Sequence, residues 1–151
     1  MKKVFLMIVI SVAALTTLTG CRSVPEIHEL PQAKAFSGRM TAEMKLCREM
    51  VVAFVRNDAE TFNRQFTTSL KHFDKNTFER TRKEVINTLG EPVSFQYLTT
   101  LEFPAFKPHF WKIRFRRTDR NGKEIFSESL LRIVTGISPE MQIVVLAFNF
   151  V

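Results

Sequence analysis

The sequence has little cysteine and little glycine, and it lacks the motifs that mark the common enzyme classes. Its 151 residues include two cysteines and five glycines. With no glycine-rich phosphate loop and no G-x-S-x-G or H-E-x-x-H pattern, nucleotide-binding, serine hydrolase and metalloprotease activities are not expected. The histidines and the internal cysteine lie on separate segments without metal-ligand spacing, so we expect no metal and no cofactor. These residues are His28, Cys47, His72 and His109.

Long runs of like charge are also absent. The chain has 22 Lys and Arg against 15 Asp and Glu, which gives a formal net charge of +7. Because the cations form neither a long run nor a basic-region helix, we expect no nucleic-acid partner. The surplus favours anionic partners such as lipid phosphates or acidic envelope polymers, or it is simply a soluble basic surface.

Only one long apolar run occurs, and it stands at the N-terminus. Lys2 and Lys3 precede the apolar stretch 4–15, which is too short for an ordinary membrane-spanning helix, and Leu18-Thr19-Gly20-Cys21 follows. This arrangement resembles the signal peptide and lipobox of bacterial lipoproteins. The resemblance implies that residues 1–20 are a signal peptide and that Cys21 carries acyl chains that hold the protein on a membrane. A plain secretory signal with a chance cysteine is the alternative.

The lipoprotein resemblance also implies a location. Arg22 follows the cysteine where inner-membrane retention usually requires Asp, which favours the periplasmic side of the outer membrane in a Gram-negative source. In any other source, the outer face of the cell membrane is expected. Residues 21–38 are polar and contain Pro25 and Pro31, which indicates a tether with a reach of about 55 Å. The remaining residues, 39–151, have the length of one domain.

Helical periodicity governs the first half of this domain. Apolar residues at helical spacing predict helices over 41–56, 59–66 and 75–89, with Asp58 and Asp74 as N-caps and Gly90 at the end of the third. Cys47 falls on the apolar stripe of the first helix, which indicates a packed thiol rather than a reactive one.

After Pro92 the period changes to two, which predicts four antiparallel strands. Their expected ranges are 93–103, 109–118, 123–135 and 141–151. The last is apolar at both parities and is expected to be central or covered on both sides. An even loop at Asn121-Gly122 places Trp111 on the same face as Glu128 and Arg132, whereas a three-residue loop reverses this.

Three helices followed by a curved four-stranded antiparallel sheet resemble the nuclear transport factor 2-like superfamily, an α+β cystatin-like fold. The local similarities are Asn57 to Phe62 after the first helix, Leu89-Gly90-Glu91-Pro92 at the entry to the sheet, and the closing strand 143–150. The resemblance implies a cone between helices and sheet that binds a small ligand or a partner. Some members, such as ketosteroid isomerases, catalyse proton transfer there.

The candidate ligand-binding residues of this cone are Tyr97, Trp111, Glu128 and Arg132. Glu128 and Arg132 lie four apart on one strand, so Arg132 neutralises the carboxylate and makes it a poor general base. The alternative is an exposed ion pair at the sheet edge beside an ordinary core tyrosine. The pairing favours binding of a small apolar ligand over catalysis.

Lys112, Arg114 and Arg116 alternate along the second long strand and form a basic row on the opposite face. The row is either a solvated sheet face or a patch for an anionic surface or an acidic envelope protein. Together these observations predict a lipid-anchored, non-enzymatic binding or interaction protein of the cell envelope. A small-molecule isomerase or dehydratase is the alternative.

Overall fold

The computed structural model describes residues 27–30, 39–66 and 73–151. The signal peptide expected at 1–20, the expected lipid attachment site Cys21 and the residue His72 lie outside these ranges. Within them, none of the helices combines the length and the apolar character that crossing a membrane requires.

The three predicted helices are present with capped ends. They are α1 (Ala42–Arg56), α2 (Ala59–Arg64) and α3 (Lys75–Leu89). Each begins after a side-chain oxygen that accepts from a backbone N–H three residues on: Thr41 from Met44 at 3.3 Å, Asp58 at 3.0 Å and Asp74 at 2.8 Å. The predicted caps at Asp58 and Asp74 are confirmed.

The sheet has five strands rather than four. They are β1 (His28–Glu29), β2 (Glu91–Thr100), β3 (Phe106–Thr118), β4 (Glu124–Ile137) and β5 (Ile143–Phe150), in spatial order β1-β2-β3-β4-β5. The last four are antiparallel as predicted, whereas β1 pairs with β2 in parallel. The extra strand was missed because two residues between prolines are too few to show a period. Two residues of the expected tether, His28 and Glu29, therefore contribute to the sheet.

The prediction that the last strand is central or covered on both sides is wrong, because β5 forms an edge of the sheet. A register shift next to Val134 and Thr135 lets Leu146 bulge out of the pairing, and Leu146 is 46% exposed. Beyond the bulge Phe148 faces the core, and before it Val145 does. A bulge reverses the alternation of side chains, so odd-numbered residues face the core before the bulge and even-numbered residues face it afterwards.

The β3–β4 hairpin has an odd loop, which overturns the predicted face of β4. Thr118 pairs with Glu124, so five residues connect the strands. The side chain of Asp119 accepts from the backbone N–H groups of Asn121 and Lys123 at 2.8 and 2.9 Å and shapes this longer turn. An odd loop turns every β4 side chain to the face opposite the one expected from an even loop.

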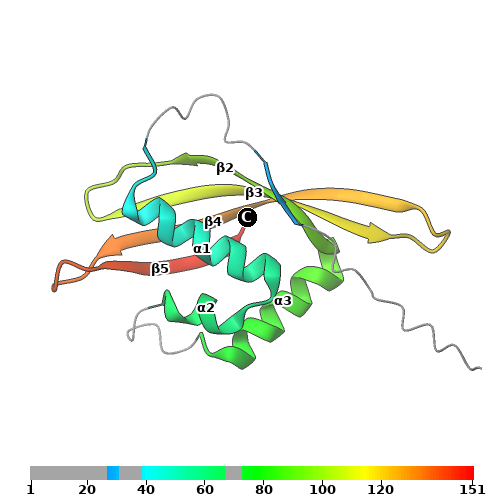
Figure 1. The fold of residues 1–151 in the computed structure, drawn as a ribbon, viewed down its shortest axis with the longest axis horizontal. Helices are drawn as coiled ribbons and strands as arrows, with labels where there is room; N and C mark the ends of the chain where they lie inside the picture. Colours follow the sequence, from blue (N-terminus) through cyan, green and yellow to red (C-terminus); the bar gives the residue numbers. More distant parts are fainter. Residues whose placement is uncertain (1–26, 31–38, 67–72) are drawn as a thin grey trace, which may run out of the picture.

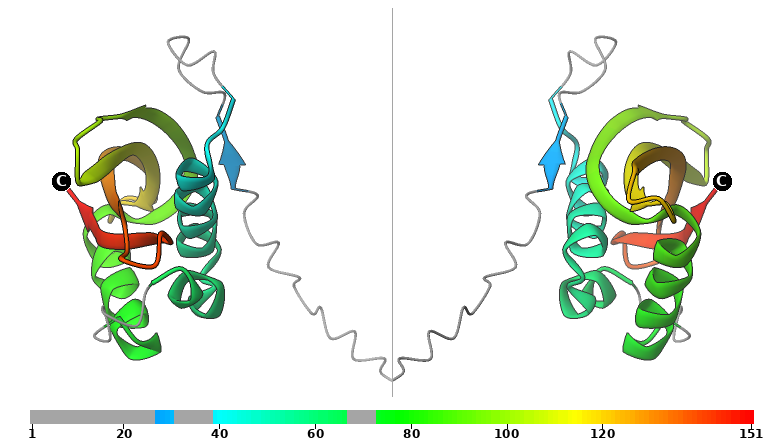
Figure 2. Two further views of the ribbon diagram at one scale, coloured as in Figure 1. Left: turned by 90° about the vertical axis from the view of Figure 1, so that its left-hand side faces the viewer. Right: turned by 90° about the vertical axis from the view of Figure 1, so that its right-hand side faces the viewer.

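All three helices lie against one face of a strongly curled sheet (Figures 1 and 2). Phe54 of α1, Phe62 of α2 and Phe78 of α3 contact one another, with ring centroids 4.9 to 6.4 Å apart. Phe148 of β5 packs on Phe62 at 4.8 Å with the rings nearly perpendicular. This aromatic cluster joins the helices to the sheet, and burial of each fully buried ring stabilises the fold by roughly 1.5–3 kcal/mol.

Gly90 allows α3 to turn directly into β2. Its φ is 101°, which is positive as expected for the end of the helix, and its N–H donates to the carbonyl of Ile86. A Cβ at this position would lie 2.3 Å from the carbonyl oxygen of Arg116 on β3. Only glycine therefore fits where the helix end meets the sheet.

Candidate functional site

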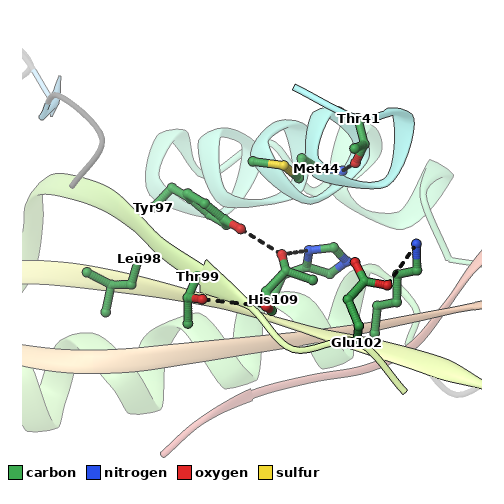
Figure 3. Close-up of a pocket in the computed structure, with 9 residues that line it drawn as sticks. Thr41, Met44, Tyr97, Leu98, Thr99, Glu102 and His109 are labelled. Carbon is green, nitrogen blue, oxygen red and sulfur yellow. Dashed lines mark hydrogen bonds and ion pairs between the residues drawn. The ribbon is translucent and has the colours of Figure 1, made fainter. Parts of the chain in front are cut away.

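The structure has a pocket at one end of α1, which we call the mouth pocket. It has a volume of about 250 Å³. In Figure 3, Thr41, the N-cap of α1, and Met44 of α1 lie over Tyr97 and His109 of the sheet. The lining residues are Thr41, Met44, Tyr97, Leu98, Thr99, Thr100, Glu102, Lys107 and His109.

A bulge in β2 gathers the polar side chains of this pocket on one face. Tyr97 pairs with Trp111 and Thr100 pairs with His109, although strict alternation would put Tyr97 and Thr100 on opposite faces. The register shift between Tyr97 and Thr99 removes that alternation. Both side chains consequently reach the helix-covered side, and their hydroxyl oxygens lie 2.7 Å apart.

A chain of hydrogen bonds runs from Tyr97 through His109 to β4. The Thr135 hydroxyl donates to the carbonyl oxygen of Lys107 at 3.4 Å, so it accepts from Nε2–H of His109 at 2.9 Å. Nδ1 of His109 then accepts from the Thr100 hydroxyl at 2.7 Å, and Thr100 accepts from the Tyr97 hydroxyl. One direction of donation satisfies every member, and it requires a neutral imidazole.

Burial keeps both titratable rings of this chain uncharged at neutral pH. His109 is 1% exposed, and this burial lowers its pKa below the ordinary value. The carboxylate of Glu43 opposes the shift, Lys107 adds to it, and Glu102 opposes it weakly. Burial likewise raises the pKa of Tyr97. His109 is thus a structural hydrogen-bonding ring with no free nitrogen for general base catalysis.

The charged groups at the pocket rim are paired. Nζ of Lys107 lies 3.2 Å from an oxygen of Glu43 on α1 and 3.4 Å from an oxygen of Glu102. Hydrogen bonding to Glu43 raises the pKa of Lys107. The pKa of Glu43 is lowered, first by a backbone hydrogen bond of its own and further by Thr41 and Lys107. One ammonium therefore faces two carboxylates, and the three groups leave the rim with a formal net charge of −1.

The four predicted ligand-binding residues do not form one site. Tyr97 lines the mouth pocket, whereas Trp111 is fully buried below it, opposite Leu131. Glu128 and Arg132 pair with Arg114 and Phe110 on the outer face of the sheet. The expected common face is wrong because the loop before β4 is odd.

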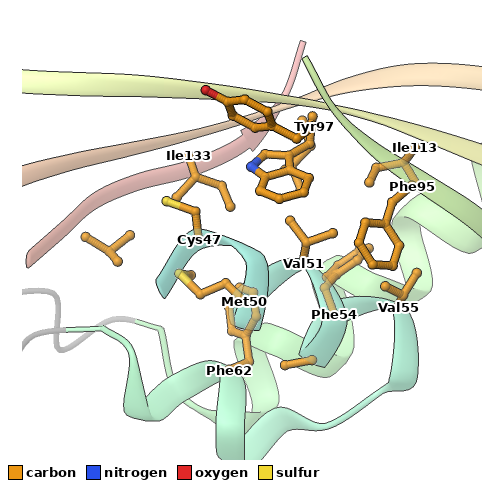
Figure 4. Packing of buried hydrophobic residues seen from close by; sticks show 14 of the residues in the cluster. Cys47, Met50, Val51, Phe54, Val55, Phe62, Phe95, Tyr97, Ile113 and Ile133 are labelled. Atoms are coloured by element: carbon orange, nitrogen blue, oxygen red, sulfur yellow. The ribbon is translucent and has the colours of Figure 1, made fainter. Parts of the chain in front are cut away.

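The predicted cone is filled by side chains. Cys47, Met50, Val51 and Phe54 of α1 pack toward Tyr97 and Ile133 of the sheet, as Figure 4 shows. Cys47 is fully buried, and burial raises the pKa of its thiol far above the ordinary value, which confirms the packed-thiol interpretation. Among the described residues, the indole N–H of Trp111 has no hydrogen-bond partner.

The basic row is present on the outer face but is largely neutralised. Nζ of Lys112 lies 3.5 Å from Glu128, and Nη1 of Arg116 lies 3.2 Å from Glu124. The guanidinium of Arg114 lies 4.4 Å above the ring of Phe126. Acids on the neighbouring strand therefore face the cations, a pattern that becomes visible only with the register.

Sequence reasoning missed the residues that complete the mouth pocket. His109 was set aside for lack of a partner within metal-ligand spacing, and Thr100 and Thr135 are ordinary strand residues. Their contact depends on the bulge in β2 and on the β3–β4 register, and neither has a local sequence signal. No group of three or more His, Cys, Asp or Glu in the described part of the chain is arranged to hold a metal ion.

Solved structures share the fold of this domain, whereas two sequence comparisons found no match. No protein-family model matches the chain, and no curated protein matches it in sequence. A ketosteroid isomerase-like protein of Erwinia carotovora atroseptica superimposes with a TM-score of 0.54 at 10% identity, over 76% of this chain and 96% of that one. The domain has the nuclear transport factor 2-like fold.

A second structure supports the same assignment of the fold. A proposed ketosteroid isomerase of Shewanella frigidimarina matches with a TM-score of 0.52 at 8% identity, over 74% of this chain and 95% of that chain. At such identities the likeness extends to the nuclear transport factor 2-like fold alone. The chemistry of this chain must come from its own residues.

Proposed function

We propose that this protein is a lipid-anchored component of the cell envelope whose nuclear transport factor 2-like domain binds a small neutral polar ligand in the mouth pocket, without catalysis. The observation that carries the binding role is the closed hydrogen-bond chain through His109, which lines a pocket whose rim charges are already paired. The anchor at Cys21 and the envelope location rest on the sequence pattern 1–21.

The lining of the pocket defines the class of ligand. The hydroxyl oxygens of Thr100 and Tyr97 donate within the hydrogen-bond chain and keep lone pairs that can accept from a ligand, while Met44 and Leu98 offer an apolar surface. The Glu43–Lys107–Glu102 cluster leaves a net charge of −1 at the rim, which disfavours an anionic ligand such as phosphate. At roughly 30 Å³ per water molecule, a pocket of about 250 Å³ holds about eight waters, which suits a monosaccharide or a molecule of similar size. A neutral polyhydroxy compound with an apolar substituent fits best.

One observation favours the isomerase alternative: the two solved structures with the same fold are named as a ketosteroid isomerase and a ketosteroid isomerase-like protein. Proton abstraction requires a base within reach of the substrate, with a pKa near the working pH. Here both ring nitrogens of His109 are engaged, and Glu102 lies against Lys107. Incubation with a ketosteroid that has an isolated double bond tests this alternative, because conjugation of that bond changes its ultraviolet absorbance.

The ligand proposal is tested with N-acetylglucosamine as a neutral probe and inorganic phosphate as a charged one. The chain has a single tryptophan, and the ring of Trp111 lies 5.2 Å from that of Tyr97. We expect N-acetylglucosamine, but not phosphate, to change tryptophan fluorescence and to shift the His109 ring resonances. Thr100→Val, which removes a hydroxyl from the pocket lining, should abolish both responses, whereas Glu128→Gln on the outer face should keep them.

Two results would overturn the ligand proposal. One is the absence of any His109 shift up to the solubility limit of N-acetylglucosamine. The other is a ligand-induced shift that survives Thr100→Val. The anchor is tested separately by Cys21→Ala followed by cell fractionation, where we expect the protein to leave the detergent phase. Unchanged partitioning would refute lipidation and would leave the mouth pocket unaffected.

A further inference from the structure

Residues 27–30 are held on the domain by contacts of three kinds, and we call this segment the clip. Its backbone pairs in parallel with β2 at His28–Ser94 and Glu29–Phe95, and the N–H of Leu30 donates to the carbonyl of Phe95 at 2.8 Å. Figure 2 shows β1 beside α1. A polar segment between two prolines thus continues the sheet as a short strand.

An ion pair fixes the register of the clip. Nε of Arg48 on α1 donates to both carboxylate oxygens of Glu29, at 3.0 and 2.9 Å, and its Nη2 approaches one of them more closely. Such forked contacts require a carboxylate at a defined position and orientation. Two residues earlier, the side chain of Ile27 packs against the core. The clip therefore presents an apolar residue and an acid at alternate positions.

The groove beneath the clip is only partly filled. It lies between α1 and β2, with a volume of about 280 Å³, and is lined by Ile27, Glu29, Arg48, Val52, Val55, Arg56 and Phe95. Within the described part of the chain, the exposed guanidinium of Arg56 forms no ion pair. The clip provides an ion-pair partner for Arg48 but none for Arg56, and it leaves room in the groove for a larger apolar side chain. An occupant with a second acid would match the groove better than the clip does.

We propose that the groove between α1 and β2 is a binding site for an extended acidic segment of a partner protein, and that the clip is its resident, exchangeable occupant. The partner adds a strand parallel to β2, with an apolar residue two positions before a carboxylate that binds Arg48 and a further carboxylate that binds Arg56. Backbone pairing provides the affinity of such strand addition, and the alternate side chains provide the specificity.

Exchange of the clip would also change the length of the tether. With the clip docked, five residues separate Cys21 from Ile27, which limits the span to about 20 Å; with it released, residues 22–38 allow about 55 Å. This consequence rests on the proposed anchor at Cys21, whereas the groove does not. A partner would then both occupy the domain and move it away from the membrane.

The test uses the full chain in detergent and a fluorescent peptide with the sequence of residues 24–33. Because the resident clip competes at an effective concentration in roughly the millimolar range, we expect Glu29→Arg to bind the peptide at least about tenfold more tightly than the unmodified chain. Arg48→Glu should abolish binding. A peptide in which arginine replaces the glutamate at position 29 should bind Arg48→Glu and thereby show that this variant is folded.

Matched controls separate the groove from general charge effects. Lys45→Glu makes the same charge change at an exposed position of α1 and should leave binding unchanged. Adding a second glutamate to the peptide should tighten binding only while Arg56 is present, which Arg56→Gln tests. Equal peptide affinity of Glu29→Arg and Arg48→Glu would overturn the proposal. So would a concentration-dependent dimer that Glu29→Arg abolishes, because the occupant would then be a second copy of the chain.

The two proposals fail independently. If the Cys21→Ala variant remains in the detergent phase but binds the peptide, the proposed lipid anchor is refuted and the proposed binding groove stands. If the protein binds N-acetylglucosamine in the mouth pocket but does not bind the peptide, the ligand-binding proposal stands and the strand-exchange proposal is refuted. Peptide affinity and His109 resonances therefore report on separate parts of the domain.

Discussion

Acidification should destabilise the domain through His109. The imidazole is 1% exposed and neutral in its hydrogen-bond chain, and its pKa is lowered by burial. In the unfolded chain a histidine titrates at about 6.5, so below that pH the unfolded state binds the proton more readily. The free energy of unfolding then falls with pH by at most about 1.4 kcal/mol per unit until the folded state also protonates. The contribution of the neutral His109 ring to the free energy of unfolding is therefore fully present above about pH 7.

The assay is urea denaturation between about pH 5.5 and 7.5, above the range in which carboxylates titrate. The matched variant is His109→Gln, whose amide can accept from Thr100 and donate to Thr135 without titrating. We expect the unmodified chain to lose stability toward pH 5.5 and His109→Gln to lose much less. A flat profile for the unmodified chain, or the same slope in both proteins, would refute the role assigned to the neutral ring.

Four substitutions test the packing. Trp111→Phe should change the free energy of unfolding by about 1 kcal/mol or less, because the loss of contacts is offset by removal of a buried indole N–H without a partner; a loss above about 3 kcal/mol would contradict this. Phe62→Ala should cost about 3–5 kcal/mol in urea denaturation, because this ring of α2 contacts rings of α1, α3 and β5. Gly90→Ala should lower the melting temperature strongly, because its Cβ would collide with the backbone of Arg116; an unchanged melting temperature would refute that contact. Glu128→Gln should cost less than about 1 kcal/mol by the same assay, because the pair with Lys112 is solvent-exposed.

Local chemistry made the helices predictable. The N-caps Asp58 and Asp74 act within three residues of themselves, and the spacing of apolar side chains defined the buried faces of α1 and α3. The alternation of β3, with Trp111 inside and Lys112 outside, was also readable because β3 lies inside the sheet and is half-buried throughout. These elements were sufficient to indicate the fold class.

Features that depend on register were not predictable. Moving one residue into the loop before β4 transfers Glu128 from the expected pocket to the outer face, where it pairs with Lys112. The bulge at Tyr97 is what brings Thr100 to His109, and no residue type specifies it. In both cases a single inserted residue determines which side chains meet, while the amphipathic pattern remains acceptable either way.

The last strand of the chain supplies two rings that lie against α1. Phe148 and Phe150 of β5 each lie within 5.5 Å of Phe54, measured between ring centroids. A growing polypeptide that ends before β5 cannot complete this cluster, so the domain cannot reach its native packing until β5 has been synthesised. If the proposed signal peptide directs export, such late closure would keep the polypeptide unfolded while it is threaded across a membrane.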